Sequence, residues 1–328
     1  MSTPLHFLYR QLFSSIPKPT ASFAGKTIIV TGSNVGLGKE AARHFTNNKA
    51  STVILAVRSL EKGEAAKQDI EKSTGIKDVV KVWQLDMSSY ESVLDFAARA
   101  EKELQRLDIA VLNAGVAKGE WEVFEKDEAT ITVNVVSTSL LALALLPKMK
   151  KTAAQFNTRP TLTIVASEMH YWAKFPEAKA PQGQIFAELN KKFPSINADN
   201  MGNRYAVSKL LDVMVTRAMA DQKAAQAIPV TINCVNPGLC HSELARDAGI
   251  GLAIMKFFLA RSTEVGSRTL VHAGASGAET HGHYLGDCKI TLVSDFVLSQ
   301  EGYEVQNRLW SELTEKLEAI KPGVTSNL

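Results

Sequence analysis

The chain has 328 residues, of which 45% are hydrophobic and 22% are charged, and its formal net charge is +3. A chain of this size and balance buries a large core without disulfides or metals, and it has no long basic run that would indicate a nucleic-acid partner. The three cysteines, Cys234, Cys240 and Cys288, contain no Cys-x-x-Cys pair, so we expect reduced thiols in a cytoplasmic protein and no metal site.

Residues 5–16 are apolar and aromatic with one arginine, a pattern compatible with a short amphipathic helix. They lack the apolar run and the cleavage site of a signal peptide, and no segment approaches the roughly 18 apolar residues of a membrane span. We predict that residues 1–23 form an arm that packs on the protein. Contact with a membrane surface is the alternative, and we expect no stable membrane insertion.

Beyond the arm, short apolar stretches alternate with helical patterns. The expected strands are 27–32, 52–57, 79–85, 109–115, 161–167 and 230–238. The expected helices are 36–49, 60–73, 90–106, 127–151 and 203–223. Apolar strands that alternate with helices predict an α/β fold, with one doubly wound parallel sheet covered by helices on both faces. We expect a single domain over residues 24–328, in which the irregular, proline-containing stretch 171–202 is an insertion.

A glycine-rich segment, 31–38, joins the first expected strand to the first expected helix. Glycine permits a sharp turn and a close backbone approach, while the helix start offers free N–H groups and a positive dipole end to phosphates. The spacing Gly-x-x-x-Gly-x-Gly differs by one residue from the common dinucleotide fingerprint. The residues that we assign to this cofactor loop are Gly32, Ser33, Asn34, Gly36, Leu37 and Gly38.

The ends of the next strands bear on the choice of cofactor. Arg58 follows the second strand, where an Asp or Glu would bind the ribose hydroxyls of NAD(H). A guanidinium pairs with a 2′-phosphate, so we infer NADP(H). Asp86 ends the third strand, where it either accepts from the adenine amino group or caps the next helix. Asn113, Ala114 and Gly115 end the fourth strand, where small residues let the backbone pass the nucleotide.

Tyr205 and Lys209 are four residues apart at the start of a helical pattern, so both side chains lie on one face. A phenol with a pKa near 10 is a poor acid–base group at neutral pH. A neighbouring ammonium and the positive ring of an oxidised nicotinamide would favour the phenolate and lower that pKa. Alone, this spacing often occurs by chance.

In its context, the spacing resembles the classical short-chain dehydrogenase/reductase family over about residues 24–290. The motifs arrive in family order: 31–38, Asp86, Asn113-Ala114-Gly115, Asn134, Ser167, Tyr205 with Lys209, and Asn236-Pro237-Gly238 with Ser242. Residues 57–63 and 282–285 are most similar to the retinol-dehydrogenase-like and fungal carbonyl-reductase branch. The resemblance implies a Rossmann-type fold.

The resemblance also implies roles for the motif residues. Tyr205 would be the general acid in reduction, and Lys209 would lower its pKa and bind the nicotinamide ribose. Ser167, preceded here by Ala166 where the family usually has another serine, would hydrogen-bond the substrate oxygen. Asn134 would hold a water that links Lys209 to solvent, and a locally satisfied amide is the alternative. Further cofactor contacts would come from Pro237, Gly238 and Ser242.

Two segments concern the substrate and the assembly. Residues 239–265, which we call the lid, are rich in Leu, Ile, Met and Phe, and they suit either a cover over a bulky apolar ligand or a helix packed on the core. Trp172, Phe175 and Phe186 are candidate walls on the other side. In carbonyl-reductase relatives a comparable insertion covers the tetramer helices, so we expect a monomer or a dimer.

Together these observations predict an NADP(H)-dependent oxidoreductase that interconverts a ketone or aldehyde with an alcohol on a bulky hydrophobic substrate, such as one of secondary metabolism. Two alternatives remain. One is a natural-product cyclase or isomerase that keeps NADP(H). The other is a non-catalytic NADP(H) sensor, against which the set Ser167, Tyr205 and Lys209 argues.

Overall fold

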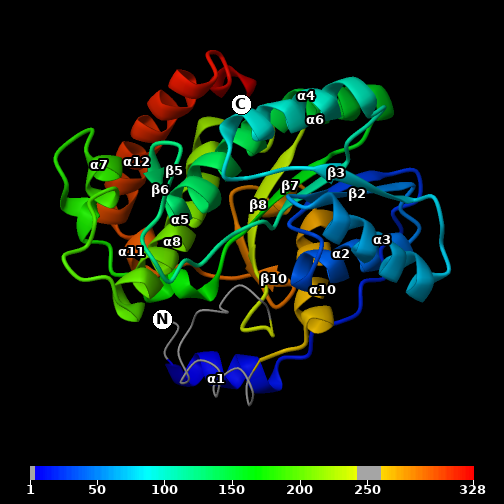
Figure 1. Cartoon of the computed structure of the whole chain (residues 1–328), viewed down its shortest axis with the longest axis horizontal. Helices are drawn as coiled ribbons and strands as arrows, with labels where there is room; N and C mark the ends of the chain where they lie inside the picture. Colours follow the sequence, from blue (N-terminus) through cyan, green and yellow to red (C-terminus); the bar gives the residue numbers. More distant parts are fainter. Residues whose placement is uncertain (1–3, 242–259) are drawn as a thin grey trace.

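The computed structural model describes residues 4–241 and 260–328. Its centre is an eight-stranded sheet with the order β10-β9-β8-β7-β4-β1-β2-β3 (Figure 1). Neighbouring strands pair in parallel except for β9 and β10, which are antiparallel. The strands are β1 (Thr27–Thr31), β2 (Thr52–Val57), β3 (Val80–Gln84), β4 (Ile109–Leu112), β7 (Thr161–Val165), β8 (Thr231–Asn236), β9 (Tyr284–Gly286) and β10 (Lys289–Ile290).

The sheet confirms the doubly wound α/β fold. Every residue of β1, β4, β7 and β8 is buried, as expected for apolar, β-branched strands covered on both faces. The strand order reverses between β1 and β4, which makes a topological switch point at the carboxyl ends of these two strands. Ligands of such sheets bind at this switch point.

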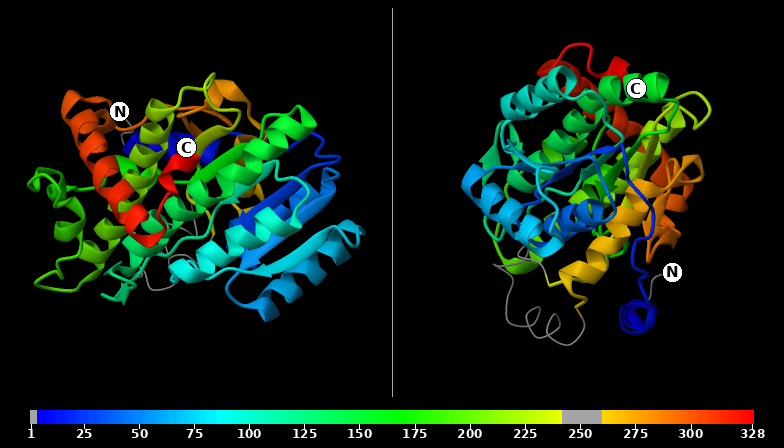
Figure 2. Two further views of the ribbon diagram at one scale, coloured as in Figure 1. Left: turned by 90° about the horizontal axis from the view of Figure 1, so that it is seen from above. Right: turned by 90° about the vertical axis from the view of Figure 1, so that its right-hand side faces the viewer.

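Helices form a layer on each face of the sheet (Figure 2). One layer packs its apolar residues with β1 and β2 in one core cluster, and it consists of α2 (Gly36–Asn47), α3 (Leu60–Thr74) and α10 (Thr263–Ala275). The other layer belongs to the larger core cluster, and it consists of α4 (Tyr90–Glu103), α6 (Thr138–Phe156) and α8 (Ala198–Gln222).

The helix expected over residues 127–151 has a more complex structure. Asp127–Glu128 is strand β6, which pairs with β5 (Val123–Phe124), and Glu128 then caps the short helix α5 (Ala129–Ile131). A π-helical turn, Thr132–Ser137, precedes α6, which continues to Phe156. Hydropathy alone does not distinguish a π turn from α-helix, and such turns are frequent at functional sites.

The helix Ala129–Phe156 corrects one sequence-based expectation. It is long and apolar enough to cross a membrane, but 94% of its most apolar window is buried inside the protein. A helix that is apolar all round and buried is a core helix.

Residues 171–202 have little regular structure, in agreement with their irregular pattern. They contain the end of a 3-10 turn (Glu168–Tyr171), a second 3-10 turn (Pro176–Lys179), helix α7 (Ile185–Leu189) and the start of α8. Helix α8 begins at Ala198, five residues before the expected start, with Asn197 accepting from the Asn200 N–H at its N-cap.

The chain ends in elements that were not predicted: α11 (Asp295–Leu298), α12 (Gln300–Ile320) and a final 3-10 turn (Thr325–Asn327). Helix α12 buries an apolar stripe, Val305, Leu309, Leu313 and Leu317, in the larger core cluster. It packs along α8 (Figure 1). The chain end packs on α6, where Lys150 Nζ donates to the Asn327 carbonyl at 2.6 Å.

Candidate active site

The glycine loop brings the ends of β1 and β4 together. Gly32 has a φ of +63°, and a Cβ there would lie 2.9 Å from Ala114 Cα. Thr31 Oγ1 accepts hydrogen bonds from the N–H groups of Asn113 (2.9 Å) and Ala114 (2.8 Å). A Cβ at Gly38 would lie 2.6 Å from Asn113 Nδ2. These glycines are therefore required by close backbone packing.

The start of α2 has the properties of a phosphate site. Its N-cap residue, Val35, has an extended backbone and offers no side-chain cap, and the first turn contains no acidic residue. Gly36 has a φ of +63°, and a Cβ there would meet no atom within 4 Å. The first N–H groups of α2 therefore have no side-chain cap, and together with the positive end of the helix dipole they suit a phosphate group. Leu37 instead packs against the core beside α10.

Arg58 is exposed immediately after β2, and we find no hydrogen bond or ion pair between it and any other residue that the structure describes. Its guanidinium is available to an anion. Asp86 is half-buried after β3, and its Oδ1 accepts from the N–H (2.9 Å) and the hydroxyl (2.7 Å) of Ser88. Asp86 therefore stabilises its own turn with Oδ1, and its Oδ2 is left to accept a hydrogen bond from a ligand.

The structure brings three predicted catalytic residues together. Tyr205 and Lys209 lie one turn apart on α8, with Lys209 Nζ 5.9 Å from the centre of the Tyr205 ring. Ser167 follows β7 by two residues, and its side chain lies close enough to the Tyr205 hydroxyl to lower the pKa of Tyr205. The Ser167 hydroxyl also accepts from the Met169 N–H at 3.2 Å. A substrate oxygen within reach of Tyr205 is therefore also within reach of Ser167.

The electrostatic setting of Tyr205 differs from expectation. Burial raises the pKa of the phenol, and this outweighs the lowering by Lys209 and by Ser167. Asp212 also raises the pKa of Tyr205. Lys209 lowers the pKa of Tyr205 as expected, but in the protein alone burial raises that pKa by more, because burial favours the neutral phenol.

Asp212 is a site residue that the sequence analysis missed. Lys209 Nζ donates to Asp212 Oδ2 at 2.9 Å and to the Val165 carbonyl at 2.7 Å, with both charged side chains less than 10% exposed. Burial raises the pKa of Asp212 to about 6 although Lys209 opposes this. The available signal was the spacing of three from Lys209, which places the carboxylate on the same helix face.

Asn134 lies in the π-helical turn, and both amide hydrogens and the amide oxygen have partners within the protein. Its Oδ1 accepts from the Val116 N–H at 2.8 Å, and its Nδ2 donates to the Val116 carbonyl and to Ser208 Oγ, both at 2.9 Å. A Cβ at Gly115 would lie 3.2 Å from Asn134 Oδ1 and 3.8 Å from Lys209 Nζ. Asn134 thus fixes the turn after β4 directly beside Lys209.

His170 is a second residue that the sequence analysis missed. Its ring is 1% exposed, with Nδ1 2.8 Å from the Ser167 carbonyl and Nε2 3.3 Å from the Ser294 N–H. Burial lowers the pKa of His170 to about 4 despite the hydrogen bond to Ser167, so the ring is neutral and donates through Nδ1. It holds the main chain at Ser167.

The turn after β8 contains the last predicted motif. Gly238 has a φ of +78°, and its N–H donates to Asn236 Oδ1 at 2.9 Å, with the buried Pro237 between them. Asn236 Nδ2 donates to Glu168 Oε2 at 3.3 Å, which links this turn to Ser167. Ser242 lies outside the described residues, as do residues 242–259 of the lid.

The three aromatic residues predicted to line the substrate site, Trp172, Phe175 and Phe186, differ in their burial. Trp172 is 38% exposed, and Phe175 packs partly buried against the core. Phe186 is only 5% exposed, and its ring lies in the core with Lys316 Nζ 5.2 Å from its centre. Phe186 is therefore a core residue and not a wall, because α7 turns it toward α12.

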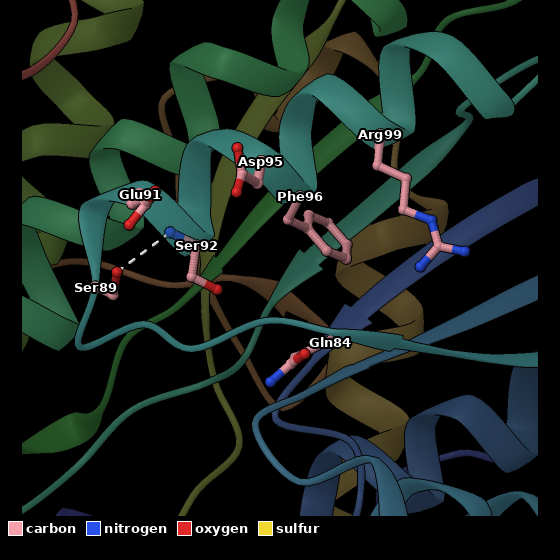
Figure 3. Close-up of a pocket in the computed structure, with 7 residues that line it drawn as sticks. All are labelled: Gln84, Ser89, Glu91, Ser92, Asp95, Phe96 and Arg99. Atoms are coloured by element: carbon pink, nitrogen blue, oxygen red, sulfur yellow. Dashed lines mark hydrogen bonds between the residues drawn. The ribbon is translucent and has the colours of Figure 1, made fainter.

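A pocket of about 350 Å³ lies elsewhere, between β3 and the first turns of α4 (Figure 3). It is lined by Gln84, Ser89, Glu91, Ser92, Asp95, Phe96 and Arg99. The hydrogen bond drawn there, from the Ser92 N–H to Ser89 Oγ at 3.2 Å, is the N-cap of α4. The pocket shares no residue with the site around Tyr205, and we assign it no role in the chemistry.

Over residues 4–241 and 260–328 there is also no group of three His, Cys, Asp or Glu side chains that could hold a metal ion.

Comparisons with known proteins agree with this geometry. A family model described as short chain dehydrogenase matches residues 26–156. The chain is 58% identical over 324 residues to the short chain dehydrogenase/reductase dmxR8 of Cryptosporiopsis sp. (strain 8999), covering 98% of this chain and 99% of that one. It is 41% identical over 330 residues to the short-chain dehydrogenase anuD of Penicillium roqueforti (strain FM164), covering 98% and 84%.

A solved structure from Mycobacterium paratuberculosis has a TM-score of 0.68 to this chain at 23% identity, covering 91% of this chain and 95% of that one. This likeness supports the fold.

Proposed function

Because this chain belongs to the short-chain dehydrogenase/reductase family, whose members are oxidoreductases that use a nicotinamide cofactor, we propose that it is an NADP(H)-dependent carbonyl reductase or alcohol dehydrogenase. The observation that carries the proposal is the convergence of Tyr205, Ser167 and Lys209 at the carboxyl edge of the sheet. A pure binding protein needs no proton donor there.

In reduction, Tyr205 donates its phenolic proton to the oxygen of the substrate carbonyl. Its raised pKa keeps the donor protonated at neutral pH before reaction. Ser167 donates a hydrogen bond to the same oxygen as negative charge develops on it. The ammonium of Lys209 stabilises the phenolate that remains, and Asp212 and the Val165 carbonyl hold that ammonium in place.

The residues present fit an NADP(H) molecule. When bound, it supplies or accepts the hydride. The N–H groups at the start of α2 would hold its pyrophosphate, and Arg58 would pair with its 2′-phosphate. Asp86 would accept from the adenine amino group with its free oxygen. Gly115, where a Cβ would lie 3.8 Å from Lys209 Nζ, would let the nicotinamide end approach Lys209 closely. The turn at Pro237 and Gly238 would contact the same end of the cofactor.

We propose a bulky, hydrophobic ketone, aldehyde or alcohol as the substrate, one that fits the secondary metabolism of fungi. The apolar composition of the lid and the partly exposed Trp172 support this class. We also propose a cytoplasmic location, which suits three cysteines that all remain free thiols.

A substrate panel tests the function. Purified protein is incubated with NADPH and with aromatic, polycyclic and small hydrophilic carbonyls, and products are identified by mass spectrometry. We expect one hydride consumed per alcohol formed, on the hydrophobic members. Product formed without net NADPH consumption would identify a cyclase or isomerase, and turnover of only the small hydrophilic carbonyls would contradict the substrate class.

A further inference from the structure

Helix α1 (Pro4–Phe13) has two distinct faces. Arg10 and Gln11 are 9% and 7% exposed, whereas Tyr9 and Phe13 are 64% and 71% exposed. The helix lies near β10 and α10, at the end of the sheet (Figure 1). The inner face of α1 contacts residues that are distant in the sequence. Among them are Glu168, which follows Ser167, and Leu239, in the turn after β8.

Arg10 bridges two carboxylates. Its Nε lies 2.7 Å from Asp287 Oδ2, and its Nη1 lies 3.4 Å from Glu168 Oε1. All three side chains are 10% exposed or less. A Cβ at Gly286 would lie 2.9 Å from Arg10 Nη2, so the guanidinium is packed tightly against the backbone after β9. Glu168 directly follows Ser167 in the chain. Arg10 therefore binds the residue next to Ser167.

A second cation completes the cluster. Arg261 Nη1 lies 2.8 Å from Asp287 Oδ1, and Arg261 Nη2 donates to the Arg10 carbonyl at 3.1 Å. Two cations and two carboxylates thus balance in a buried setting. Removing one member leaves buried charge without full compensation, which disturbs the geometry of the others.

Gln11 pairs with the main chain of the turn after β8. Its Nε2 donates to the Leu239 carbonyl at 2.7 Å, and its Oε1 accepts from the Leu239 N–H at 3.2 Å. The same Leu239 carbonyl accepts from the Arg261 N–H at 2.9 Å. Leu239 follows Gly238, so Gln11 acts on the turn proposed to face the nicotinamide end of the cofactor.

The contacts of Arg10 and Gln11 are connected through the segments beside Ser167 and Gly238. Glu168, held by Arg10, accepts from Asn236 Nδ2 at 3.3 Å. Asn236 in turn accepts from the Gly238 N–H. A continuous chain of hydrogen bonds therefore runs from α1 through Glu168 and Asn236 to the turn that Gln11 holds on its other side.

We propose that α1 is part of the active site, and that Arg10 and Gln11 are positioning residues that set the distance between the Ser167 turn and the 236–239 turn. This inference rests on the proposed reaction at Tyr205. Hydride transfer requires the substrate carbonyl at the Ser167 turn and the nicotinamide at the 236–239 turn to lie in the right relative position, and a misplacement of about 1 Å can cost roughly 100-fold in rate.

The test uses full-length Arg10→Met and Gln11→Leu, with Phe13→Ser on the outer face of α1 as the matched control. Gln11→Leu removes no charge and so remains informative if Arg10→Met folds poorly. For each variant we would measure kcat, KM, the isotope effect with NADPH deuterated at the transferred position, the melting temperature and amide hydrogen exchange.

We expect kcat/KM on a reduced ketone to fall about tenfold or more in both inner-face variants, with a larger isotope effect as hydride transfer becomes slower. Amides of residues 236–241 should exchange faster in both variants, and Arg10→Lys should restore part of the rate. Phe13→Ser should match the wild type. Faster exchange at 236–241 is independent of turnover, so it supports the positioning role even if no ketone is reduced.

Wild-type kinetics within twofold and unchanged exchange at 236–241 in both inner-face variants would overturn the proposal. A parallel Tyr205→Phe variant separates the two possible failures. Full activity in Tyr205→Phe refutes the reaction, whereas an inactive Tyr205→Phe beside fully active Arg10→Met and Gln11→Leu refutes only the role of α1.

Discussion

At the scale of single residues, the chemistry around Tyr205 depends on a balance of charges. Lys209 favours the phenolate, burial opposes it, and Asp212 both holds Lys209 and opposes ionisation of Tyr205. Burial raises the pKa of Asp212 to about 6, so the charge of this carboxylate changes near neutral pH, where enzymes commonly work.

Asp212→Asn tests this balance through pH. Above pH 6 the wild-type carboxylate is charged, so its removal leaves Lys209 to favour the phenolate more strongly. We expect the rising limb of log kcat for alcohol oxidation to move to lower pH in the variant. Below pH 6 the wild-type Asp212 is itself protonated, so the two profiles should converge. A rising limb that stays in place or moves to higher pH would show that Asp212 has no such influence.

Arg58→Ala tests the choice of cofactor. Hydrogen bonds to charged groups contribute about 1.5–3 kcal/mol, so kcat/KM for NADPH should fall by roughly tenfold to a hundredfold. The value for NADH, which has no 2′-phosphate, should change little. Steady-state kinetics with both cofactors measure this. An equal loss with NADPH and NADH would mean that Arg58 does not contact the phosphate.

The sequence was most informative where chemistry imposes a spacing. The pair Tyr205 and Lys209 was predicted from its spacing, and Ser167 from the family resemblance, and the structure brings all three together. Arg10 was not connected to the site because its partners, Glu168 and Asp287, are 158 and 277 residues away. These ion pairs form because α1 packs beside the segments that follow β7 and β9. No local sequence pattern predicts such a contact.

At the scale of elements, the contact between β1, α2 and β4 sets the cofactor loop. It depends on glycine at positions where backbones nearly touch. Gly38 and Gly202 are both helical glycines, but a Cβ at Gly38 would meet Asn113 Nδ2 at 2.6 Å and the Gly32 carbonyl at 2.7 Å, whereas a Cβ at Gly202 would meet nothing within 4 Å.

Gly38→Ala should therefore lower the free energy of unfolding by about 1–3 kcal/mol through overpacking and should weaken NADPH binding. The matched control, Gly202→Ala, should raise the free energy of unfolding by up to about 1 kcal/mol, because alanine favours the exposed helix. Urea unfolding and fluorescence titration with NADPH measure both quantities. Equal effects of the two substitutions would contradict the close approach at Gly38.

Strands and helices of the sheet were largely predictable because their apolar runs are continuous. The π-helical turn at Thr132–Ser137 was not, because it shares the hydropathy of the α-helix around it. Helix α12 was missed although its buried residues recur every four positions, Val305, Leu309, Leu313 and Leu317. That period is a readable signal of an amphipathic helix.

At the scale of the whole molecule, the face of α6 and α8 is covered by the chain itself. Helix α12 packs on α8, and the chain end packs on α6 through Lys150. The insertion also contributes α7, which Glu312 of α12 holds by accepting from the Phe186 N–H at 3.1 Å. The parts of α6 and α8 that these segments cover are not exposed to another subunit.

Size-exclusion chromatography with light scattering should accordingly give the mass of a monomer or a dimer of the 35.7 kDa chain. The reason is that the covered helices cannot form a further interface without displacing α12. A stable tetramer at micromolar concentration would contradict this, and deletion of residues 300–328 would then show whether α12 shapes the assembly.

The central claim is that Tyr205 supplies the proton. The most direct measurement is the single-turnover rate of ketone reduction by NADPH in Tyr205→Phe, beside its affinity for NADPH. We predict a rate about 10²–10⁴-fold below that of the wild type, because the variant lacks the general acid, with NADPH affinity within a few-fold. A Tyr205→Phe protein that reduces the ketone at the wild-type rate would contradict the account.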